Sequence, residues 1–125
     1  MGKLVFFVDD DKMILNLLEY TLKNKRDYDV KTFFTGEDCL AQLKLNPDLI
    51  VLDHIFKSNG KSGKNGLEIL KEIKHFNKNL PVIILTSQED QNLADEFLSN
   101  GAAKFIPKND YFIDALMETI EKQIF

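Results

Sequence analysis

The sequence lacks the features of a disulfide-stabilised or membrane-spanning protein. Its single cysteine, Cys39, excludes an internal disulfide and a zinc site built from cysteines. Three prolines and six glycines leave no linker or low-complexity tail. No apolar stretch approaches the length of a membrane span, and no signal peptide opens the chain. We therefore expect a cytoplasmic protein in which Cys39 is a small buried residue on a helix.

The composition is that of one ordinary globular domain. A chain of 125 residues can enclose a single substantial core, so residues 1–125 are expected to form one domain. Hydrophobic residues make up 44% and charged residues 29%, as in typical globular proteins. The net charge of −4 argues against direct binding to nucleic acid or to acidic membranes.

Short apolar runs alternate with helical patterns along the whole chain. The runs are KLVFFV (3–8), YDVKTFF (28–34), DLIVLD (48–53), PVIILT (81–86) and AKFIP (103–107). Three of them are nearly continuous, which is typical of parallel strands buried on both faces. Five such strands alternating with five helices predict an α/β fold, a flavodoxin-like (βα)5 doubly wound parallel sheet of order 2-1-3-4-5.

Between these runs, apolar residues recur at helical spacing. They are Ile14, Leu17, Leu18 and Leu22; Leu40 and Leu43; Leu67, Leu70 and Ile73; Leu93, Ala94, Phe97 and Leu98; and Phe112, Ala115, Leu116 and Ile120. The helix ends carry matching signals. Asp11 and Thr35 are predicted N-caps, and SNG (99–101) predicts a helix C-terminus at glycine.

Reactive side chains follow four of the five expected strands. Asp9 and Asp10 follow the first strand, Asp53 ends the third, Thr86 ends the fourth and Lys108 follows the fifth. In open α/β sheets the functional site lies beyond the carboxyl ends of the strands. With the first and third strands adjacent, the three aspartates should converge in one crevice flanked by the hydroxyl and the ammonium.

These residue types favour a metal and a phosphoryl group. Carboxylates this close together need a cation or partial protonation. Mg²⁺ prefers oxygen ligands, including one or two carboxylates together with a phosphate oxygen. A carboxylate can also act as a nucleophile and form an aspartyl-phosphate. Lys108 could balance the charge of the phosphoryl group, and the Thr86 hydroxyl could hydrogen-bond one of its oxygens.

Five motifs in order resemble the receiver (CheY-like) domain of two-component response regulators. They are VDDD, PDLIVLD, GLEILKEI, PVIILTS and NGAAKFIPK, and the resemblance covers essentially the whole chain. It implies that Asp53 accepts a phosphoryl group from a histidine kinase or a histidine phosphotransfer protein. The domain would then be a signalling module that promotes its own phosphorylation and dephosphorylation, and not an enzyme acting on a separate substrate.

The resemblance also implies the ligands of a metal ion. Asp10 and Asp53 would bind Mg²⁺ together with the backbone carbonyl of Ile55, and Asp9 would act through water. Ile55, two residues past the acceptor, and Gln88, two past Thr86, would tune the access of water to the acyl phosphate.

A conformational switch is implied in the same way. Thr86 and Lys108 would hold the phosphoryl oxygens, and Phe105 would rotate inward when Thr86 moves. The face formed by the strand 103–107 and its two flanking helices would then bind an effector or an output domain, or a second copy in a phosphorylation-dependent dimer.

Three features depart from the family pattern. The lysine is usually followed by proline through a cis bond, whereas Asn109 follows Lys108 here. A cis bond without proline costs about 2.5–4 kcal/mol, so either strain is held at the site or this bond is trans. The segment 54–66 is longer than usual, and His54 replaces an apolar residue.

Two other functions are compatible with parts of the sequence. Asp9 and Asp11 form an Asp-x-Asp pair after an apolar strand, as in haloacid-dehalogenase-like phosphatases, although Lys12 and Met13 do not fit that pattern. A receiver-like interaction module that is not regulated by phosphate is the third possibility. The intact set of acids argues against it, and Asn109 argues weakly for it.

Overall fold

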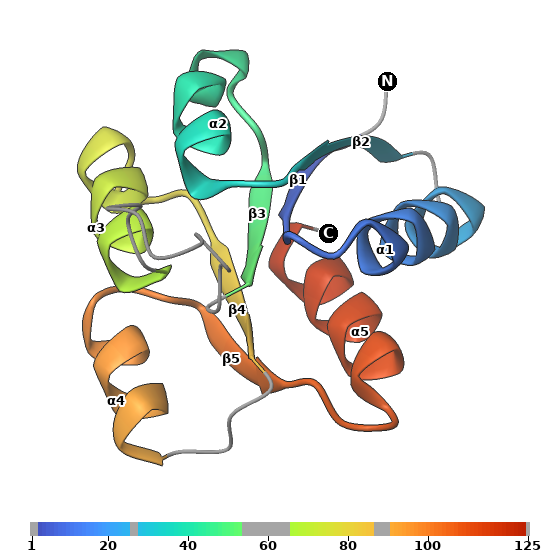
Figure 1. The fold of residues 1–125 in the computed structure, drawn as a ribbon. Helices are drawn as coiled ribbons and strands as arrows, with labels where there is room; N and C mark the ends of the chain where they lie inside the picture. Colours follow the sequence, from blue (N-terminus) through green and yellow to red (C-terminus); the bar gives the residue numbers. More distant parts are fainter. Residues whose placement is uncertain (1–2, 26–27, 54–65, 87–90, 125) are drawn as a thin grey trace.

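The computed structural model describes residues 3–25, 28–53, 66–86 and 91–124 (Figure 1). The strands are β1 (Lys3–Val8), β2 (Tyr28–Phe33), β3 (Leu49–Asp53), β4 (Val82–Thr86) and β5 (Lys104–Pro107). The helices are α1 (Lys12–Lys25), α2 (Gly36–Ala41), the 3-10 turn η1 (Leu43–Leu45), α3 (Gly66–Phe76), α4 (Gln91–Ser99) and α5 (Phe112–Ile124).

The five strands form one parallel sheet in the order β2-β1-β3-β4-β5. This is the predicted flavodoxin-like topology, with β1 and β3 adjacent at the centre. The register places Val8 beside Leu52 and Asp53 beside Leu85. The carboxyl ends of β1 and β3 therefore lie side by side, which sets the position of the site.

Helices cover both faces of the sheet and enclose two hydrophobic clusters. Figure 1 shows α1 and α5 on one face and α2, α3 and α4 on the other. Phe7, Leu18 and Leu116 belong to the cluster under α1 and α5, whereas Phe6 and Phe97 belong to the opposite one. Every residue of β3 and β4 is buried. Burial on both faces explains why these two strands are continuous apolar runs.

In two helices, one residue predicted on the buried face is exposed and a nearby apolar residue is buried in its place. In α1, Leu18 and Leu22 are buried as predicted, but Leu17 is 46% exposed and Leu15 is buried. Ala115 is likewise exposed, while Met117 is buried. Both helices carry more apolar residues than the sheet can cover. Spacing alone therefore could not show which edge of the apolar stripe faces inward.

The predicted helix ends are confirmed. The Asp11 carboxylate accepts hydrogen bonds from the backbone N–H groups of Met13 and Ile14, and Thr35 Oγ1 accepts one from Asp38 N. Gly101 has φ +102°, the left-handed conformation in which glycine ends a helix at little cost.

Cys39 is fully buried on α2, and burial raises the pKa of its thiol to about 12. The prediction of a small buried residue is therefore confirmed. Among the described residues, no helix is long and apolar enough to cross a bilayer.

Candidate functional site

The ends of β1 and β3 place two aspartates next to each other. Asp53 is the last residue of β3, and Asp9 directly follows β1, where its backbone N–H donates to the Phe33 carbonyl of β2 at 3.0 Å. This bond extends the β1–β2 pairing to Asp9. The carboxylate of Asp9 is thus held by the sheet rather than by a loop.

Asp9, Asp10 and Asp53 form an acidic cluster, as the sequence predicted. One carboxylate oxygen from each lies within 4.8 Å of the others. Asp9 and Asp53 are only 2% and 4% exposed, and Asp10 is half-buried. Burying carboxylates is costly unless they are paired or bind a cation, so this cluster requires positive charge nearby.

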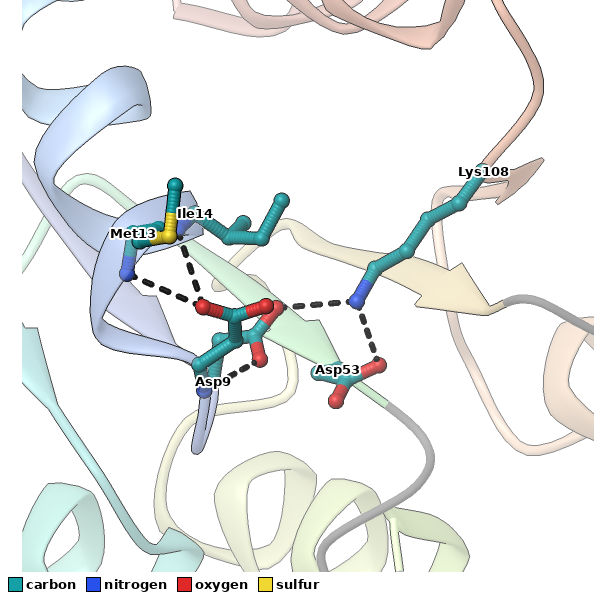
Figure 2. A network of polar contacts seen from close by, with 6 residues as sticks. Asp9, Met13, Ile14, Asp53 and Lys108 are labelled. Carbon is teal, nitrogen blue, oxygen red and sulfur yellow. Dashed lines mark hydrogen bonds and ion pairs between the residues drawn. The ribbon is translucent and has the colours of Figure 1, made fainter.

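Lys108 supplies one such charge. Its Nζ lies 2.9 Å from Asp9 Oδ2 and 3.2 Å from Asp53 Oδ1, and Figure 2 shows the side chain extended from the end of β5 to both carboxylates. The Lys108 backbone N–H also donates to the Thr86 carbonyl at 2.7 Å. The Lys108 side chain therefore links the end of β5 to the ends of β1 and β3.

The electrostatics of Lys108 reflect this double pairing. Burial of the ammonium on its own lowers the pKa of Lys108. The hydrogen bond to Asp9 and the negative charges of Asp53 and Asp9 together outweigh burial and raise this pKa above 10.5. Lys108 is therefore a permanent cation at neutral pH.

Asp9 has a further contact that sequence reasoning missed. Its Oδ1 accepts a hydrogen bond from the Asp11 N–H at 2.9 Å, while its Oδ2 receives Lys108. The contact between Lys108 and Asp9 was also missed, because the sequence assigned this ammonium to the phosphoryl oxygens alone. No local signal in the sequence marks a contact between residues 99 positions apart.

Thr86 and Phe105 lie on the same face of the sheet. Thr86 is fully buried at the end of β4, and its neighbour in β5 is Pro107, two residues from Phe105. Phe105 is half-buried, and its ring lies 5.9 Å from that of Phe97 on α4. Thr86 at the end of β4 and Phe105 beside α4 therefore lie on the face of the sheet that α4 covers.

Three predictions about the loops have different outcomes. No peptide bond is cis within the described part of the chain, so the bond between Lys108 and Asn109 is trans. Ile55, with its carbonyl, and Gln88 lie outside the described residues. So do His54 and all of the segment 54–66 except Gly66.

The donor set fits Mg²⁺. Three carboxylates of the described residues offer oxygens that lie within 4.8 Å of one another, and hard oxygen ligands suit this ion. Asp11, which the haloacid-dehalogenase alternative requires in the site, is exposed and caps α1. The acidic cluster paired with Lys108, at the carboxyl ends of a 2-1-3-4-5 sheet, defines the receiver class.

The comparisons with known proteins agree with this class. The family model described as "Response regulator receiver domain" matches residues 5–121. The alkaline phosphatase synthesis transcriptional regulatory protein PhoP of Bacillus subtilis is 33% identical over 73% of this chain and 36% of its own length. The DNA-binding transcriptional regulator NtrC of Salmonella typhimurium is 34% identical over 97% of this chain and 24% of its own length.

Solved structures show the same fold. The BeF3-activated DrrB receiver domain has a TM-score of 0.85 at 28% identity, covering 98% of this chain and 97% of that one. The receiver domain of the Francisella response regulator 1452 has a TM-score of 0.85 at 26% identity, with the same coverage. The chain belongs to the receiver domain family of two-component response regulators. It spans between 16% and 36% of the length of the curated relatives it matches.

Proposed function

We propose that residues 1–125 form one receiver domain that accepts a phosphoryl group on Asp53, in a Mg²⁺-dependent reaction, from a histidine kinase or a histidine phosphotransfer protein. The observation that carries this proposal is the meeting of Asp9, Asp10, Asp53 and the Lys108 ammonium at one end of the sheet. Asp53 is the last residue of the central strand β3 and is buried, so the sheet fixes its position at the site.

The proposed transfer is a nucleophilic substitution at phosphorus. A carboxylate oxygen of Asp53 forms the new O–P bond while the N–P bond of the donor phosphohistidine breaks. The imidazole leaves with the electron pair and takes a proton from solvent. Lys108 and the Thr86 hydroxyl hold phosphoryl oxygens, so the ammonium that pairs with Asp53 before transfer stabilises the negative charge after it.

The metal would be held by Asp10, Asp53 and the carbonyl of Ile55, with Asp9 acting through water. Bound there, Mg²⁺ supplies positive charge to the phosphoryl oxygens in the transition state. Support comes from the three carboxylate oxygens that lie within 4.8 Å of one another.

Phosphorylation would be read out through Thr86 and Phe105. Movement of Thr86 toward the phosphoryl group frees space on its face of the sheet, where Phe105 packs beside Phe97. The surface of α4, β5 and α5 would then bind an effector or an output domain, or a second copy as a phosphorylation-dependent dimer. The domain would act as a switch and not as an enzyme with a separate substrate.

The lifetime of the phosphorylated state is proposed to depend on Ile55 and Gln88. Hydrolysis needs a water in line with phosphorus, and polar side chains near that line can orient it. Ile55 offers no hydrogen bond, and Gln88 orients water more weakly than a general base. Slow autodephosphorylation follows from these two residue types.

The acceptor can be tested by intact mass spectrometry after incubation with Mg²⁺ and acetyl phosphate. The wild-type chain should gain one phosphoryl group, and Asp53→Asn should not. Asp29→Asn is a matched control, because Asp29 is exposed on β2 and its replacement makes the same charge change. Phosphorylation of Asp53→Asn at the wild-type rate would show that the acceptor is another residue.

A further inference from the structure

Asn109 joins the end of β5 to the start of α5 through three hydrogen bonds. Its backbone N–H donates to the Pro107 carbonyl at 2.9 Å, and its carbonyl accepts from Phe112 N at 3.2 Å. Its side-chain Oδ1 accepts from the Tyr111 N–H at 2.9 Å. The last bond is an Asx turn, in which the side chain of asparagine fixes the backbone two residues on.

The neighbouring Lys108 must reach far across the sheet. Its backbone follows β5 at the sheet edge, while Asp53 ends β3 two strands away, about 10 Å by the usual strand spacing. Asp9 lies one strand further on, yet Nζ is within 3.2 Å of both carboxylates. A long, flexible side chain spans this distance only if its backbone starts in the right direction.

We propose that Asn109 is a positioning residue, whose Asx turn directs Lys108 to Asp9 and Asp53. The proposal rests on the proposed function, because it assigns to Lys108 a part in phosphoryl transfer. Asn109 is exposed, so its side chain fills no space in the core. What it contributes is the single acceptor oxygen that holds the turn, one residue after the lysine.

The chain contains a matched control for this turn. Asn77, between α3 and β4, accepts from Asn79 N through Oδ1 at 3.0 Å, and its carbonyl accepts from Leu80 N at 3.2 Å. These two bonds repeat the Asx turn of Asn109, whereas the Asn77 N–H donates to the Ile73 carbonyl of α3 at 2.9 Å. Asn77 is exposed and lies before β4, therefore at the opposite end of the sheet. The same substitution at Asn77 removes an equivalent turn without touching Lys108.

The test compares Asn109→Ala, Asn109→Asp and Asn77→Ala with the wild-type domain. The first measurement is the rate of phosphorylation by acetyl phosphate with saturating Mg²⁺. Asn109→Ala should be slower by about tenfold, since small misplacements of a charge-stabilising group are costly. Asn109→Asp keeps the acceptor oxygen and should restore most of the rate, and Asn77→Ala should stay within about twofold of wild type.

The second measurement needs no phosphoryl transfer. In the metal-free domain, the Lys108 ammonium should give a ¹H–¹⁵N signal protected from solvent exchange by its bonds to Asp9 and Asp53, assigned by its loss in Lys108→Met. Asn109→Ala should lose this protection, Asn109→Asp should regain it, and Asn77→Ala should keep it. This signal tests the position of Lys108 even if Asp53 proves not to be the acceptor.

The proposal is overturned if Asn109→Ala keeps both the wild-type rate and the protected signal. It is also overturned if Asn77→Ala loses them to the same extent, because the effect would then be one of general stability. Equal melting temperatures of the two alanine variants, measured alongside, make the comparison independent of folding.

Discussion

Asp9 and Asp10 are neighbours in sequence, but the fold gives them different environments. Asp9 is 2% exposed and is bonded to Lys108 and to the Asp11 N–H, so much of its charge is already compensated. Asp10 is half-buried, hence more open to solvent than Asp9, and it contributes one oxygen to the same cluster. The two acids should therefore differ in how much each contributes to binding a cation.

We predict that Mg²⁺ binding depends more on Asp10 than on Asp9. Asp10→Asn removes a proposed direct ligand and should weaken binding by more than about 100-fold, whereas loss of an indirect partner in Asp9→Asn should cost about tenfold. Isothermal titration calorimetry with Mg²⁺ measures the affinities of both variants, and Asp29→Asn controls for the loss of one negative charge. Equal affinities of the two site variants would reject this ranking.

At the scale of elements, α2 and α3 approach too closely for a side chain at Gly36. A Cβ there would lie 2.5 Å from both Cγ1 and Cδ1 of Ile69, which is itself fully buried. Gly36 is thus required by the contact between the two helices and not by an unusual φ angle.

We predict that Gly36→Ala lowers the free energy of unfolding by about 1–3 kcal/mol, because the fully buried Ile69 must shift within the core to make room for the added methyl group. Ile69→Ala removes the atoms with which the new methyl group would clash. The losses in free energy of unfolding caused by Gly36→Ala and Ile69→Ala should therefore be non-additive. The double variant should then be little less stable than Ile69→Ala alone. Urea unfolding of the four proteins gives the coupling, and strictly additive losses would show that the helices separate freely.

At the scale of the whole molecule, Lys108 connects the ends of β1, β3 and β5. Because the pKa of Lys108 is raised in the folded protein, these ion pairs make the free energy of unfolding depend on pH. In the unfolded chain Lys108 loses its proton near 10.5, whereas the folded protein keeps it to higher pH. The stabilisation that the Lys108 ion pairs give to the fold is therefore complete below about pH 10.5. It is lost as the pH rises through the higher pKa that Lys108 has in the folded protein.

We predict that the metal-free wild-type domain loses stability more steeply above about pH 10.5 than Lys108→Met does. Lys31→Met, at an exposed position on β2, controls for the removal of one lysine. Urea unfolding between about pH 8 and pH 12 measures the slopes. Parallel slopes for wild type and Lys108→Met would contradict the linkage.

Sequence alone determined the fold class, the strand order and the identity of the clustered acids. Continuous apolar runs mark strands buried on both faces, and such strands with helical crossovers allow few topologies. The position of Asp9 and Asp53 directly at strand ends then places them at one edge. These are local patterns, and they can be recognised without knowing any contact.

Only the tertiary structure decided which edge of α1 faces the sheet, with Leu15 buried and Leu17 exposed. It also decided that Lys108 bridges Asp9 and Asp53, and that a trans bond and an Asx turn at Asn109 precede α5. The reason is physical. These features depend on how strands far apart in sequence align and how much of each helix the sheet can cover, and neither quantity is contained in a local pattern.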